Sequence, residues 1–208
     1  MKLPALPFTS GCIIFAFIST HALADNPVYV TPYIGYTFSN QIKDENGIKL
    51  QPENDPHFAI AVETNVEPGR VGLFLSHQPT EMKGLEGDGS FTYLHFQSSL
   101  RYEAMTKLDA FFGASLGTTF VDGDWSENSV LFSGGLFGGA EYKMNKNAKI
   151  VFEGRWLANF IDSHTTAICH LPTGNQTCHI IVDSKILSQV QTNIGVSFSF
   201  QLPIYMAF

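Results

Sequence analysis

Stretches of alternating apolar and polar residues recur along the chain. In residues 28–38, for example, Ile34 and Phe38 fall on one face, and Tyr33 and Thr37 fall on the other. A period of two is typical of a β-strand whose two faces meet different surroundings. No long segment shows the 3.6-residue period of an amphipathic helix. The same alternation predicts seven further strands, over residues 57–66, 70–76, 91–103, 108–120, 130–143, 150–160 and 190–200.

The connections between these strands alternate strictly between long and short. The long, polar connections are residues 39–56, 77–90, 121–129 and 162–186. The short connections are residues 67–69, 104–106 and 144–147. An antiparallel up-and-down meander with one plain end and one elaborate end has this order. The sequence therefore predicts an all-β fold, an eight-stranded antiparallel up-and-down barrel.

The polar face of the predicted strands carries charges of both signs. A membrane barrel has an apolar exterior and a polar interior, whereas a soluble ligand-binding barrel has an apolar interior. Paired charges suit the narrow lumen of eight strands, which side chains fill, so a general diffusion pore is not expected. We therefore predict a transmembrane barrel, while the soluble alternative would place the same charges in water. The predicted lumen network consists of Glu63, Arg70, Arg101, Glu103, Asp109, Glu141, Glu153 and Arg155.

The N-terminal segment has the features of a secretory signal peptide. Lys2 supplies the positive charge, residues 11–18 are apolar, and Ala22-Leu23-Ala24 has the small-x-small form of a cleavage site. The apolar run is far shorter than the ~20 residues of a membrane-spanning helix. We predict that residues 1–24 are a cleaved signal peptide and that residues 25–208 form the barrel domain.

The C-terminal segment resembles the signal by which the barrel-assembly machinery recognises a last strand. The residues that carry this resemblance are Asn193, Gly195, Phe198, Phe200 and the terminal Phe208. With the predicted architecture, they make residues 25–208 similar to the small outer-membrane barrels of Gram-negative bacteria, of the OmpX, OmpW and OmpA-barrel type. The resemblance implies location in the outer membrane, with outer-membrane lipid, lipopolysaccharide and the assembly machinery as partners. It also implies short periplasmic turns and longer outer loops.

Composition agrees with a barrel and excludes other classes. Only 15% of the 208 residues are charged, 13% are aromatic and 18 are glycine. This mixture argues against a disordered chain and against a helical bundle. The net charge of −7 and the lack of a basic stripe argue against nucleic acid as a partner.

Two cysteines, Cys169 and Cys178, lie in the last long connection, and each precedes a histidine. The third cysteine, Cys12, lies in the predicted signal peptide, so the mature chain has an even number of cysteines. In an exported chain this favours a disulfide, which here closes an outer hairpin. The alternative is a metal site of two thiolates with His170 and His179. Its spacing departs from the common zinc pattern. We expect the disulfide and no cofactor.

Four functions are compatible with these patterns. The first is a structural or surface-interaction role through the outer loops. The others are transport of small hydrophobic molecules, lipid A modification, and a soluble exported barrel that binds an apolar ligand. A hydrolase needs a nucleophile beside a histidine, but Ser76 and His77, like His95 and Ser98, fall on opposite strand faces. We therefore predict no enzyme.

Overall fold

The computed structural model is an all-β protein. It describes residues 26–40, 42–43, 49–50, 52–81, 88–123, 130–160, 167–171, 174–178 and 186–201. The predicted signal peptide and Phe208 lie outside these residues. No helix among the described residues is long and apolar enough to cross a membrane.

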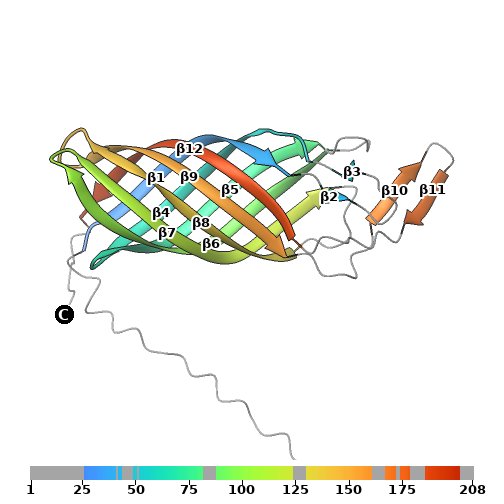
Figure 1. The fold of residues 1–208 in the computed structure, drawn as a ribbon, viewed down its shortest axis with the longest axis horizontal. Helices are drawn as coiled ribbons and strands as arrows, with labels where there is room; N and C mark the ends of the chain where they lie inside the picture. The colour runs from blue at the N-terminus through green and yellow to red at the C-terminus, as the bar shows by residue number, and fades with distance from the viewer. Residues whose placement is uncertain are drawn as a thin grey trace, which may run out of the picture.

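Eight antiparallel strands close into a barrel, and consecutive barrel strands pair with one another (Figure 1). Closure joins the first strand to the last, and Val28 is paired with Phe200. Pro32 interrupts this pairing, because proline has no N–H to donate to the neighbouring strand. Two small hairpins, β2–β3 and β10–β11, stand apart from the barrel sheet. The strands are β1 (Val28–Ser39), β2 (Ile42–Lys43), β3 (Lys49–Leu50), β4 (Pro56–Val66), β5 (Gly69–Glu81), β6 (Asp88–Met105), β7 (Leu108–Gly123), β8 (Val130–Lys143), β9 (Ala148–Phe160), β10 (Ala167–Leu171), β11 (Gly174–Cys178) and β12 (Ile186–Phe200).

The two ends of the barrel differ, as the alternating connections predicted. One end, called here the turn end, carries the turns that join β4 to β5, β6 to β7 and β8 to β9. The opposite end, called the loop end, carries the long connections and both hairpins (Figure 1). β5 and β6 stay paired as far as Glu81 and Asp88, so the prediction of one connection over residues 77–90 is wrong. β12 likewise begins at Ile186, before the predicted residue 190, because its pairing with β9 extends to Phe160.

The side chains alternate between an apolar exterior and a polar interior. Large apolar side chains point outward and stay exposed, including Phe58 at 67% and Leu116 at 62%. Charged Arg155 and Glu141 point inward, and each is only 1% exposed. A soluble barrel with an apolar ligand cavity would have the reverse distribution. The structure therefore contradicts that alternative and leaves a continuous apolar surface around the outside.

Apolar side chains also occupy two levels of the interior. Phe111 and Phe137, which the alternation places inside, pack in the first cluster with Phe74 and Tyr33. The second cluster lies nearer the loop end. Its buried members are Phe91, Tyr93, Val121, Leu157 and Leu187.

Inward-facing glycines make room for these interior rings. A Cβ atom on Gly139 would clash with the backbone carbonyl oxygen of Phe152 on β9 and would lie 2.9 Å from Cζ of Phe111, its paired residue on β7. A Cβ atom on Gly113 would meet the ring of Phe137 in the same way. Gly154 is different, because it is exposed on the exterior and has no atom within 4 Å of that position. The glycine content therefore serves interior packing at defined positions.

We expect Gly139→Ala to lower the free energy of unfolding by about 1–3 kcal/mol, because the added methyl clashes with the Phe152 backbone carbonyl and overpacks the lumen against Phe111. Gly154→Ala is the matched control and should change it by less than about 0.5 kcal/mol. Urea unfolding of the two variants in lipid vesicles measures both values. Equal stability of the variants would contradict the packing role of Gly139.

Candidate functional site

A cluster of alternating positive and negative side chains fills the lumen towards the turn end. Arg70 lies 3.0 Å from Glu141 and 3.7 Å from Glu63. Arg101 lies 3.1 Å from Glu63 and also contacts Glu141. The four side chains come from β5, β8, β4 and β6, and none is more than 13% exposed. Each guanidinium thus faces two carboxylates, which offsets the cost of burying four charges.

Arg155 of β9 occupies the middle of the lumen. Its Nε donates to Glu153 at 2.9 Å and its Nη2 donates to the side-chain oxygen of Gln97 at 2.8 Å. The guanidinium carbon lies 3.7 Å from the ring centre of Phe74 and 4.2 Å from that of Phe137. With a further hydrogen bond to Ser115 at 3.3 Å, two ring faces and three hydrogen-bonded partners surround one cation. This arrangement closes the cross-section of the barrel with side chains.

Gln97 joins Arg155 to the charged cluster. Its side-chain nitrogen donates to Glu63 at 2.9 Å, while its oxygen accepts from Arg155. At the turn end Lys149 continues the series, with Glu141 at 3.0 Å and Asp109 at 3.4 Å. These hydrogen bonds and ion pairs connect the interior charges into one network.

Glu103 departs from the predicted lumen set. Its side chain is 59% exposed, and its one ion-pair partner among the described residues is Lys143 at 3.8 Å. It lies where the pairing of β6 and β7 shifts between Glu103 and Met105, at the very end of the barrel. The face alternation therefore placed Glu103 correctly relative to its strand, but the lumen ends before it. The structure does bring together the other members: Glu63, Arg70, Arg101, Asp109, Glu141, Glu153 and Arg155.

The lumen nearer the loop end carries uncharged hydrogen-bonding groups. His95 lies 3.0 Å from Ser115 and 2.7 Å from Ser133 through its two ring nitrogens. Ser133 lies 2.9 Å from Thr119, whose hydroxyl also reaches Asn159 at 2.7 Å. All five residues are almost completely buried. Although His95 has two serine neighbours, neither its position nor theirs is open to a substrate.

Further hydrogen bonds extend this series towards the loop end. Asn159 donates to the Tyr93 hydroxyl at 3.0 Å, and Tyr93 donates to Gln189. Gln189 in turn donates to Ser39 at 3.0 Å. Ser115 connects the uncharged groups to the charged network, because Arg155 donates to it at 3.3 Å. Side chains from all eight barrel strands thus form one hydrogen-bonded series along the lumen.

The residues of the predicted assembly signal also have structural contacts. Asn193 faces the lumen. Its side-chain oxygen lies 2.6 Å from Nε2 of His57, and its side-chain nitrogen donates a hydrogen bond to Glu153 at 3.1 Å. A Cβ atom on Gly195 would lie 2.6 Å from the Tyr33 ring. Phe198 and Phe200 instead point outward and are about half exposed. Recognition by the assembly machinery stays a prediction for this segment.

The two cysteines lie on the small hairpin at the loop end. β10 and β11 pair Cys169 with Gln176 and Ala167 with Cys178. The arms of this hairpin are therefore Ala167–Leu171 and Gly174–Cys178. The side chains of this hairpin lie outside the described residues, so the disulfide stays a prediction. No group of three or more His, Cys, Asp or Glu side chains in the described part of the chain is arranged to hold a metal ion.

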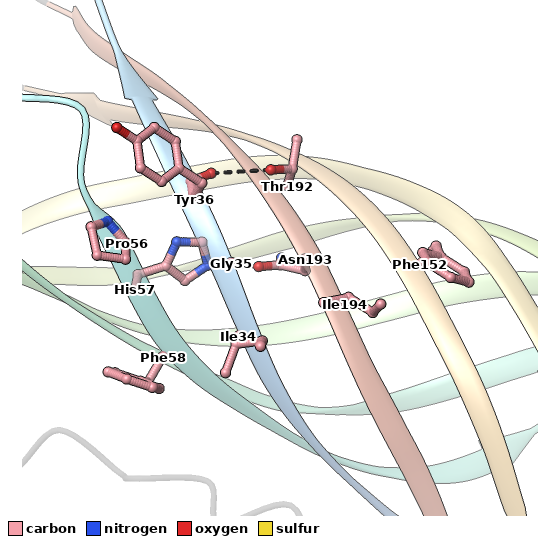
Figure 2. A pocket seen from close by; sticks show the side chains of 10 residues that line it. All are labelled: Ile34, Gly35, Tyr36, Pro56, His57, Phe58, Phe152, Thr192, Asn193 and Ile194. Carbon is pink, nitrogen blue, oxygen red and sulfur yellow. Dashed lines mark hydrogen bonds between the residues drawn. The ribbon is translucent and has the colours of Figure 1, made fainter.

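The outer wall carries an open groove of about 590 Å³ over β4, β1, β12 and β9 (Figure 2). Phe58, Ile34, Ile194 and Phe152 follow one another across the four strands and form one side of it. Thr192 lies beside this row, and its hydroxyl donates to the Tyr36 carbonyl at 3.3 Å (Figure 2). This hydrogen bond satisfies the hydroxyl, so the groove presents a largely apolar surface. Sequence patterns could not reveal it, because it depends on the register of four strands.

We expect Arg155→Met to lower the free energy of unfolding by about 3–5 kcal/mol, because Glu153 would remain buried without its cation. Arg155→Met combined with Glu153→Gln should lose less, since the uncharged amide is cheaper to bury. Urea unfolding in vesicles provides the comparison. If the single and double variants are equally destabilised, the ion pair does not contribute as described.

The chain resembles known proteins in its three-dimensional structure rather than in its sequence. No family model and no curated protein matches its sequence. Neisserial surface protein A superposes with a TM-score of 0.58 at 11% identity, over 83% of this chain and 97% of that one. The outer membrane protein OprG from Pseudomonas aeruginosa gives 0.53 at 15% identity, over 86% and 97%. The outer membrane protein AlkL, solved in DMPC lipid bilayers, gives 0.54 at 14% identity, over 99% and 100%.

These likenesses cover most of the described barrel, although few of the aligned residues are identical. They agree with the closed order of eight antiparallel strands and with the apolar exterior. The structure therefore has the fold of the small outer-membrane β-barrels, as the sequence resemblance implied.

Proposed function

We propose that this protein is a bacterial outer-membrane barrel whose role is structural or interactive and is exerted through its loop end. The observation that carries the proposal is the distribution of polarity. Large apolar side chains cover the outside, while Arg155, Glu153 and Glu141 are buried inside. Such an exterior is stable in lipid and unfavourable in water. The fold shared with outer membrane proteins supports the same location.

The packed lumen supports a role other than free diffusion of solutes. Arg155 lies between two phenyl rings in mid-lumen, and the Arg70 and Arg101 cluster fills the lumen beyond it. Short turns of such barrels lie in the periplasm and longer loops lie outside the cell. The loop end would then face the exterior, with the β10–β11 hairpin beyond the rim (Figure 1). Contacts with surface partners therefore belong to this end.

Membrane fractionation of cells that make the full chain tests the proposal. We expect the protein in the outer-membrane fraction, soluble only in detergent, with a gel mobility that shifts on boiling. The reason is that a closed barrel with paired lumen charges resists unfolding until it is heated. A soluble periplasmic protein whose mobility does not shift would contradict the proposal.

Electrical recordings test the closed lumen. In planar lipid bilayers we expect the purified protein to give no stable conductance steps, because side chains close the lumen at Arg155. Replacement of Arg155, Phe74 and Phe137 by alanine together should still give no such steps, because the Arg70 and Arg101 cluster and the second apolar cluster continue to fill the lumen on either side. Regular conductance from the unaltered protein would show that solutes pass, and the interactive role would then lose its support.

The groove on the outer wall favours a second candidate, transport of small hydrophobic molecules. Its walls are apolar and include Phe58, Ile194 and Phe152. The two candidates differ in where a ligand binds, at the loop end or on the wall. Thr192→Trp fills the groove without altering the loops. It should abolish uptake of a hydrophobic compound if the groove serves transport, and leave contacts of the loop end unchanged.

A further inference from the structure

The turn end carries four lysines on two neighbouring turns. Lys107 precedes β7, and Lys143, Lys146 and Lys149 surround the turn between β8 and β9. The two turns are joined by a hydrogen bond from the Lys143 amide to the Lys107 carbonyl, at 2.8 Å. In the second turn, the Asn145 side chain accepts hydrogen bonds from the next backbone amides, at 2.9 and 2.8 Å. The backbone that presents these lysines is therefore well ordered.

Among the described residues, two of the four lysines form ion pairs with carboxylates. Lys143 lies 2.7 Å from Asp109, and Lys149 lies between Asp109 and Glu141. Lys107 and Lys146 are exposed, and neither has an ion-pair partner among the described residues. The excess of positive charge is therefore local to Lys107 and Lys146, because Glu67 and Glu103 also lie at the turn end and the chain as a whole has a net charge of −7.

Apolar and aromatic side chains surround the two unmatched lysines. Met105, which ends β6, is 69% exposed, and Met144, in the turn between β8 and β9, is 48% exposed. Tyr102 and Tyr142 point outward from the same strand ends, at 59% and 45% exposure. Tyrosines of this kind mark the interface between acyl chains and headgroups in membrane barrels. Lysine side chains at such an interface can lay their carbon stems along apolar surface and keep the ammonium group among the headgroups, and we expect this of Lys107 and Lys146.

We propose that this cationic rim, defined by Met105, Lys107, Met144 and Lys146, binds an anionic phospholipid of the periplasmic leaflet. Lys107 and Lys146 contact the headgroup phosphates, and the methionines and tyrosines contact the upper acyl chains. Charge complementarity selects this occupant, because a basic segment at a lipid surface attracts anionic headgroups. The described loop end is unlike it, since Glu53, Glu81, Asp88 and Asp122 lie there. The inference rests on the proposed location in the outer membrane.

The test uses the full mature protein, purified in zwitterionic micelles. Phosphatidylglycerol and phosphatidylcholine are added separately, and native mass spectrometry counts the lipids that stay bound. We expect preferential retention of phosphatidylglycerol. Lys107→Gln with Lys146→Gln should weaken its apparent affinity roughly thirty-fold, since each lysine near a lipid surface contributes about one kcal/mol. Lys43→Gln with Lys49→Gln, at the loop end, is the matched control and should retain the preference.

Each outcome of this test decides the inference. Loss of the preference in the turn-end variant alone supports the lipid site. Equal retention of both lipids, or an unchanged preference in that variant, overturns it. Displacement of phosphatidylglycerol by an equal concentration of inorganic phosphate would also overturn it, because the site would then be a free-anion site. If in those cases the protein is still found in the outer-membrane fraction and its gel mobility still shifts on boiling, the result rejects the lipid site and leaves the proposed function supported.

Discussion

The pairing of buried charges inside a closed eight-stranded barrel is the interaction on which the rest of the structure depends. Eight strands enclose a space that side chains just fill, so the interior cannot supply bulk water to a charged group. A buried charge without a partner would cost several kcal/mol. Arg70, Arg101 and Arg155 each have carboxylate partners from other positions in the lumen. The pairs of Arg70 and Arg101 join β4, β5, β6 and β8 across the lumen, whereas Arg155 and Glu153 both belong to β9.

Packing around the charges follows from the same narrow space. The guanidinium of Arg155 lies against Phe74 and Phe137, so the rings cover the faces of the cation that receive no hydrogen bond. The rings in turn need room, which Gly113 and Gly139 provide on the neighbouring strand segments. Charge pairing, ring stacking and glycine placement are therefore parts of one arrangement. Together they leave the outer wall and the two ends for contacts with other molecules.

The two ends and the wall present different chemistry to their surroundings. The wall is apolar and includes a groove beside Thr192, which suits hydrocarbon. The turn end combines tyrosine, methionine and unmatched lysine side chains, which suits an anionic lipid surface. The described part of the loop end is acidic instead. This difference along the barrel axis is the basis for the proposed direction of insertion and for the proposed role of the loop end.

The sequence by itself determined the barrel strands and the direction in which their side chains point. Alternation is a local property, because successive residues of a strand face opposite sides, so Tyr33 and Ile34 were assigned to opposite faces correctly. It also placed most of the lumen charges. Strand ends were less certain, since pairing continues into polar segments such as residues 77–81, which alternation does not mark.

Only the tertiary structure decided which of the inward residues meet. The contact of Arg155 with Gln97, and that of Asn193 with His57, depend on strand register and barrel closure, which join residues far apart in the chain. The same closure showed that Glu103 lies beyond the lumen, although its strand face was predicted correctly. Local periodicity carries no information on where a lumen ends or on which side chains face each other across it. Those features follow from the geometry of all eight strands together.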